Sequence, residues 1–198
     1  MNRAELVASL KEGNRIFTKT DFHGQDLSAL DLGNCDFRWC DFAGANLGKT
    51  VFIDSNLWEA DLYAVQGMEA SFCNANLRGA NLCEAKFQGA YFTDADLNRA
   101  KMCEADMSGA GFAGTNMSWS KICETRLIDA YLQGADLRHA NLQEANLTEA
   151  YIGEARFEGA RLFETNFLRV GGLDTAMLRG ALFHKTKGIS FYRRIFGR

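Results

Sequence analysis

The sequence predicts an all-β solenoid, in which the chain winds around a solid core in about 8 four-sided coils. One observation is a period of five: of the 34 positions from Phe17 to Leu182 whose numbers end in 2 or 7, 32 hold Leu, Phe, Met or Ile. A small residue, most often alanine, stands two positions before nearly all of them. The other observation is a period of 20, because similar blocks begin at residues 81, 101, 121, 141 and 161: NLCEA, KMCEA, KICET, NLQEA and RLFET.

A period of five fits neither an α-helix nor a flat strand. Five residues advance a helix by about 500°, so the apolar positions would wander around its surface. On a strand, an odd period sends successive large residues to opposite faces. The pattern needs a chain that turns through a constant angle at every block. Four blocks in each period of 20 then make a square coil, with coils stacked about 4.8 Å apart.

Three segments follow from this pattern: an N-terminal capping helix over 1–15, the β-helix over 16–184, and a C-terminal tail or cap over 185–198. Leu6, Val7 and Leu10 have helical spacing, which predicts the capping helix. Capping is expected because open coils expose unpaired backbone. The tail could also bind an anionic membrane surface, since it mixes aromatic with basic residues: Lys185, Lys187, Phe191, Tyr192, Arg193, Arg194, Phe196 and Arg198.

The charge is unevenly distributed along the chain. The net charge of the 198 residues is −3, which argues against a generally basic nucleic-acid binder. Residues 17–184, however, hold 14 basic and 23 acidic side chains, a formal charge of −9, between basic ends. No apolar run has the length of a membrane helix, and the first residues lack the apolar core of a secretion signal. A cytoplasmic protein is the expectation.

The sequence predicts no catalytic, cofactor or metal site, and therefore no enzyme. The inward columns are apolar, and one of them is a ladder of phenylalanines from Phe52 to Phe112. The six cysteines show no zinc-site or CxxC spacing. Cys83, Cys103 and Cys123 fall in one column beside a row of glutamates. Free thiols are the favoured interpretation, and a redox role or a metal site is the alternative.

One outward side stands out as a candidate edge for binding a partner. All three tryptophans map onto it, together with several arginines, and both residue types are enriched in binding hot spots. A weaker candidate is the column of Tyr91, Tyr131 and Tyr151 on the adjoining side. The candidate edge comprises Trp39, Trp58, Trp119, Arg38, Arg78, Arg99, Arg138 and His139.

Four stretches carry a more specific resemblance: Ala75-Asn76-Leu77, Ala95-Asp96-Leu97, Ala135-Asp136-Leu137 and Ala145-Asn146-Leu147. They resemble the A-(D/N)-L-x-x consensus of the pentapeptide-repeat family, and the resemblance extends over about residues 16–184. It implies a right-handed quadrilateral β-helix and, because the family is common in bacteria, a bacterial source. It also implies a non-catalytic scaffold that presents a rigid rod to a protein partner, which the sequence does not identify.

The resemblance implies an alternative function as well. Some pentapeptide-repeat proteins mimic duplex DNA, bind DNA gyrase and confer quinolone resistance. An acidic rod suits a basic DNA-binding groove. The register without insertions, the short basic tail and the arginines on the tryptophan edge argue against this function. Direct binding of nucleic acid is not expected.

Overall fold

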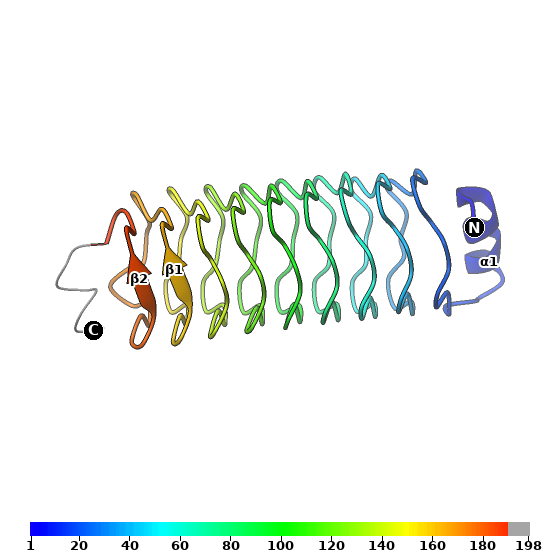
Figure 1. Ribbon diagram of the computed structural model, residues 1–198. Helices are drawn as coiled ribbons and strands as arrows, with labels where there is room; N and C mark the ends of the chain where they lie inside the picture. Colours follow the sequence, from blue (N-terminus) through cyan, green and yellow to red (C-terminus); the bar gives the residue numbers. More distant parts are fainter. Residues whose placement is uncertain (190–198) are drawn as a thin grey trace.

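Residues 1–189, which the computed structural model describes, form a rod of stacked coils that follow one another in sequence order (Figure 1). The helix α1, Arg3–Lys11, lies at one end. The short parallel strands β1, Arg161–Phe163, and β2, Leu182–His184, lie near the other. Within these residues no helix has the length and apolar character needed to cross a bilayer.

Parallel bridges define the length of one coil. They join each block to the fourth block after it, beginning with Ile16 and Asp36 and continuing to Tyr151 and Gly171. Side chains stack in the same way: Asn76 Nδ2 donates to Asn56 Oδ1 at 2.9 Å, across a sequence separation of 20. The period of 20 in the sequence is therefore the length of a coil, and every position in the block becomes a column along the rod.

Each block of five is a tight turn whose backbone bonds to its own block and to both neighbouring coils. In the block that starts at Ser71, the Ala75 N–H donates to the Phe72 carbonyl at 3.0 Å and closes the turn. Asn74, the third residue of that turn, has a left-handed φ of 58°, as type II turns require. The Phe72 N–H donates to the carbonyl of Tyr91 in the next coil, and the Ser71 N–H to that of Thr50 in the previous one.

The Asp or Asn that often begins a block satisfies one more backbone group. Its side-chain oxygen accepts the N–H of the residue two positions later, as in Asn76 with Arg78 at 3.2 Å and Asp96 with Asn98 at 3.0 Å. These are local bonds that Asp and Asn make readily in turns. The Asp or Asn at the first position of a block is therefore a partner of the turn backbone.

The interior is filled by apolar side chains. Phe52, Phe72, Phe92 and Phe112 are fully buried, and their rings stack with centroids 5.0 Å apart and planes within 5° of parallel. The predicted phenylalanine ladder is confirmed. Fully buried alanines fill the small inward columns, for example Ala90 and Ala95 at 0 and 1% exposure.

The period of five breaks once, near the end of the rod, and the prediction of an unbroken register is wrong there. Met177 and Leu182, expected in the core, are exposed, and Leu178 is buried instead. One extra residue enters the turn after Gly172, so the bridge partner of Arg156 is Met177 and not Ala176. Gly172 permits this turn because its φ is +73° and its Cα lies against the Gly153 backbone, where a Cβ would clash.

The first coil is covered by α1. Leu6 is fully buried in the core, and Leu10 packs against it. Asn2 caps the helix by accepting the Glu5 N–H at 3.0 Å. Arg3 donates to the Asp26 and Ser28 carbonyls, so that part of the open edge is bonded.

At the other end, Ile189 is buried against the core. Of the tail residues singled out in the sequence, six lie outside the described residues: Phe191, Tyr192, Arg193, Arg194, Phe196 and Arg198. The role of this tail as a cap or a membrane-binding segment stays a prediction.

The stacked rings make a direct prediction about stability. Phe92→Ala removes a fully buried ring from the ladder and should lower the free energy of unfolding by about 3–5 kcal/mol. Urea unfolding followed by circular dichroism measures this, with the outward-facing Thr93→Ala in the same block as the control. A loss below about 1 kcal/mol for Phe92→Ala would contradict the filled core.

Candidate functional site

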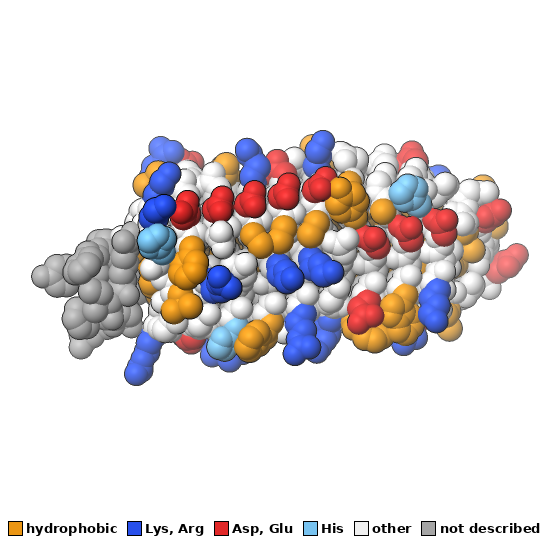
Figure 2. Space-filling view, viewed as in Figure 1, with side chains coloured by type: hydrophobic (Ala, Val, Ile, Leu, Met, Phe, Trp, Pro, Cys, Tyr) orange, Lys and Arg blue, Asp and Glu red, His pale blue; other side chains and the backbone are white. Residues whose placement is uncertain are grey.

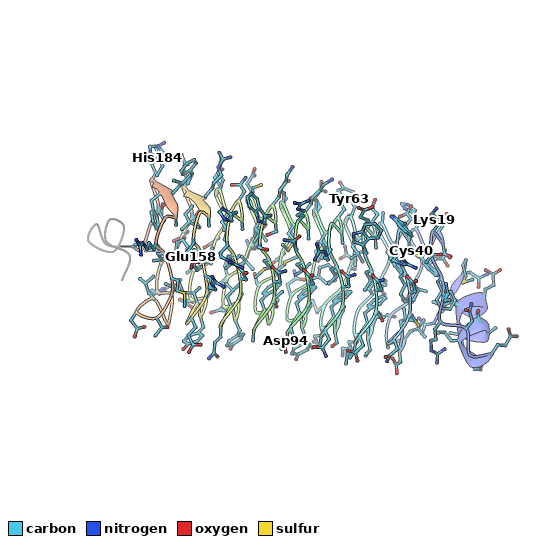
Figure 3. All side chains as sticks on the ribbon, turned by 90° about the horizontal axis from the view of Figure 1, so that it is seen from below. Lys19, Cys40, Tyr63, Asp94, Glu158 and His184 are labelled. Atoms are coloured by element: carbon cyan, nitrogen blue, oxygen red, sulfur yellow. The ribbon has the colours of Figure 1, made fainter. Side chains whose placement is uncertain are left out.

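The rod has four long sides, defined by the outward first, third and fourth residues of each block. Side A takes these residues from the block that starts at residue 16 and from every fourth block after it. Sides B, C and D are defined in the same way, from the blocks that start at residues 21, 26 and 31. After Gly172 every block starts one residue later, because of the extra residue in that turn. Seen from below, Tyr63 and His184 of side B lie along one edge and Asp94 of side D lies along the opposite edge (Figure 3).

The three tryptophans lie on side A, but they are not equally accessible. Trp39 and Trp119 are exposed, at 39 and 58% of their surface, and both have a left-handed φ at the corner of a turn. Trp58 is half-buried, with its ring centroid 4.9 Å from that of Trp39 at an angle of 63°. Two tryptophans therefore offer most of the aromatic surface.

Trp39 is held by polar and cationic neighbours. Its Nε1 donates to Glu59 at 3.0 Å, and the Lys19 Nζ and Arg38 Cζ lie 5.4 and 5.3 Å from its ring centroid. Cations at this distance stabilise an aromatic face. A ring fixed in this way loses little rotamer freedom on binding. Trp39, Trp58 and their neighbours form the first tryptophan cluster.

Trp119 and His139 form the second tryptophan cluster. Their rings stack with centroids 4.3 Å apart and planes 20° from parallel.

Several arginines of side A are paired with a carboxylate on the same side. Arg38 donates to Asp36 through both Nε and Nη2, and Arg138 bonds to Asp136 in the same way. The side-chain bond from Arg38 lowers the pKa of Asp36. Arg78 reaches Asp96 at 3.3 Å. The D-x-R spacing in the sequence indicates the pairs Asp36–Arg38 and Asp136–Arg138, because the first and third residues of a block lie on the same side.

Arg99 differs from these arginines, because it is exposed and makes no ion pair within residues 1–189. It borders a shallow depression of about 250 Å³ between the two tryptophan clusters. Trp119 lies four coils along the rod from Trp39, a distance of about 19 Å at the spacing of β-strands. The depression is lined by Trp58, Glu59, Arg78, Gly79, Asn98 and Arg99.

The charge of the rod differs sharply from side to side. Between residues 17 and 184, side A has seven cationic and five acidic side chains, whereas sides B and D each have a net charge of −5. The acidic row on side B is visible along the axis in Figure 2. The cations of side A are Lys19, Arg38, Arg78, Arg99, Arg138, Arg156 and Arg179.

The cysteine column on side B brings two thiols together. The Sγ atoms of Cys103 and Cys123 lie 2.9 Å apart, and both residues are half-buried with free thiols. Burial raises the pKa of Cys83, and burial together with the contact to Cys103 raises that of Cys123 to about 12. Such thiols stay protonated at neutral pH and are poor nucleophiles. Among the described residues no three His, Cys, Asp or Glu side chains converge as metal ligands would.

Comparison with known proteins agrees with this architecture. A sequence profile of pentapeptide repeats matches with 8 copies, over residues 14–42, 31–65, 68–102, 90–127 and 125–162. A search of curated protein sequences finds no significant match.

Two solved structures share the fold. HetL, a pentapeptide repeat protein involved in heterocyst differentiation regulation from the cyanobacterium Nostoc sp. strain PCC 7120, is 23% identical, with 94% of each chain covered and a TM-score of 0.57. A trypsin-treated form of QnrB1, a plasmid-mediated fluoroquinolone resistance protein, is 16% identical, with 91% of this chain and 92% of that chain covered and the same TM-score. Because the profile covers well over half of the sequence, this chain belongs to the pentapeptide-repeat family.

Proposed function

We propose that this protein is a non-catalytic scaffold that binds a protein partner along side A. The observation that carries the proposal is the pair of exposed tryptophans, Trp39 and Trp119, on the one side whose net charge is positive. The proposal includes a right-handed quadrilateral β-helix and a cytoplasmic location.

The filled interior favours binding over catalysis. An enzyme needs a concave site with convergent polar groups. Here the core columns are fully buried and mostly apolar, the hydroxyls of inward threonines such as Thr50 and Thr115 donate to backbone carbonyls, and the depression on side A is shallow and open. Burial raises the pKa of the Cys83 and Cys123 thiols, which disfavours nucleophilic chemistry by these two residues. Rigid solenoids instead present extended surfaces to their partners.

Side A has the dimensions of a site for an extended segment. The distance of about 19 Å between the two tryptophan clusters corresponds to about six residues of extended chain. The two aromatic clusters would anchor the ends of such a segment, and Arg99 has no competing ion pair within residues 1–189. Tryptophan and arginine anchors commonly dominate the energy of an interface.

The double variant Trp39→Ala/Trp119→Ala tests this proposal. A partner captured from the native host should bind it at least about 30-fold more weakly, because the loss of even one hot-spot tryptophan costs about 2 kcal/mol or more. The measurement is the dissociation constant of that partner for purified wild-type and variant proteins. Met68→Ala, an exposed apolar residue on side C, is the matched control and should leave the affinity unchanged. Equal affinity of all three proteins would contradict the role of side A.

A second candidate function is binding to DNA gyrase in place of DNA. Its support is the −9 charge of the rod and the shared fold with QnrB1, a fluoroquinolone resistance protein. The seven cations along side A count against it, because a basic DNA-binding groove would repel them. The nearly unbroken register also counts against it, because the one insertion within the described residues adds only a single residue, in the turn after Gly172.

A gyrase supercoiling assay separates the two functions. As a side-A scaffold, the protein should neither inhibit supercoiling nor protect gyrase from a fluoroquinolone, even in molar excess. Inhibition or protection that weakens when Asp54 and Asp94 are both changed to asparagine would favour the DNA-mimic function instead.

A further inference from the structure

Side D has a chemistry that the proposed function does not use. Between residues 31 and 175 its outward positions hold no lysine or arginine. They hold five carboxylates, all exposed, and none forms an ion pair within the described residues. These carboxylates are Asp31, Asp54, Asp94, Glu154 and Asp174.

Three exposed tyrosines stand in one column on the same side. Tyr91, Tyr131 and Tyr151 expose 54, 61 and 41% of their surface, and their hydroxyls make no hydrogen bond within residues 1–189. Bridges join Tyr91 to Gly111, Gly111 to Tyr131, and Tyr131 to Tyr151. The side therefore presents three aromatic rings that are each about half exposed.

Gly111 opens a slot in this column. It lies between Tyr91 and Tyr131, and a Cβ there would meet only Cδ1 of the Tyr91 ring, at 3.9 Å, which is ordinary van der Waals contact. The two tyrosines are two coils apart, about 10 Å, with bare backbone between them. A cation over Gly111 would lie one coil, about 5 Å, from the backbone of each tyrosine, which puts it within reach of both rings for a cation–π interaction.

A carboxylate stands at the rim of the slot. Asp94 Oδ1 occupies the space that a Cβ at Gly114 would fill, so the Asp94 side chain leans over the coil of Gly111. It belongs to the same block as Tyr91 and is exposed. A cation held between the rings would therefore have an acidic partner nearby, with no lysine or arginine on this side to compete for it.

We propose that side D is a docking surface for an extended protein segment that places an arginine or lysine side chain between Tyr91 and Tyr131. Charge complementarity selects this occupant, since an acidic segment would meet only carboxylates here. Arginine fits best, because its planar guanidinium stacks on aromatic faces and pairs with a carboxylate at the same time. The surface is independent of side A and adds a second kind of partner segment.

The test uses the full chain and two labelled Gly/Ser peptides, one with a central arginine and one with citrulline in its place. Citrulline keeps the size and removes the charge. Fluorescence anisotropy should show the arginine peptide binding at least about 10-fold more tightly than the citrulline peptide, since cation–π and ion-pair terms together exceed about 1.4 kcal/mol. Binding should weaken as salt is raised.

Two variants locate the binding at the slot. Gly111→Val fills its floor without removing a ring, and a β-branched residue suits this bridging position because the φ of Gly111 is not positive. Tyr131→Ala removes one wall. Each should lose at least about 10-fold in affinity for the arginine peptide, whereas Tyr63→Ala, an exposed tyrosine on side B, should not. Thermal unfolding of each variant shows that the rod is intact.

Several outcomes would overturn the proposal. Equal binding of the two peptides removes the need for a cation. If the Gly111→Val and Tyr131→Ala variants are folded and still bind the arginine peptide as the wild type does, the site lies on another acidic surface, such as side B. If sedimentation shows that the wild type is a dimer and that the Tyr131→Ala variant is a monomer, the occupant is a second copy of the chain. Binding of an oligosaccharide in place of the arginine peptide would make the column a sugar platform.

Discussion

The hydrogen bonds between successive coils are the constraint on which the rest of the molecule depends. Bonds such as Phe72 N–H to the Tyr91 carbonyl, at 2.7 Å, recur in nearly every block. Buried backbone groups must be paired, and a coil of tight turns cannot pair them all within itself. Each coil therefore has to lie in register on the next, four blocks further along the chain.

The same constraint accounts for the unusual turns. Within residues 1–189, twenty-four non-glycine residues have a positive φ, nearly all at the fourth position of a block. Such a conformation costs about 1–2 kcal/mol for residues other than glycine, and the stacked bonds and the filled core offset that cost. Its effect is to place one residue of each block at a corner of the rod. Trp39, Trp119 and Arg99 are all at this position.

Columns then give each side of the rod its own chemistry. Side A combines exposed tryptophans with arginines, side B stacks glutamates beside cysteines, and side D combines exposed tyrosines with exposed carboxylates. An outward substitution changes one column and leaves the core untouched. The fold can thus hold two independent binding surfaces, while its interior admits no site.

Sequence periodicity predicted the coil length, the core columns and the side on which each tryptophan lies, because all three depend only on counting residues. It failed at the turn after Gly172. Met177 and Leu182 stand at the sequence positions predicted for the core, but the extra residue in that turn shifts the register and places their side chains outward. It also could not predict the half-burial of Trp58 or the space over Gly111, because both depend on how neighbouring side chains pack.

The central claim is that four blocks make one interchangeable coil, and deleting one coil tests it most directly. Removal of residues 121–140 should leave a folded rod that unfolds cooperatively and is shorter by about 5 Å in small-angle X-ray scattering. Removal of 123–140, which leaves two residues of the coil in place, should destroy the register and the fold. An unfolded product from the whole-coil deletion, or equal stability of the two deletions, would contradict the account.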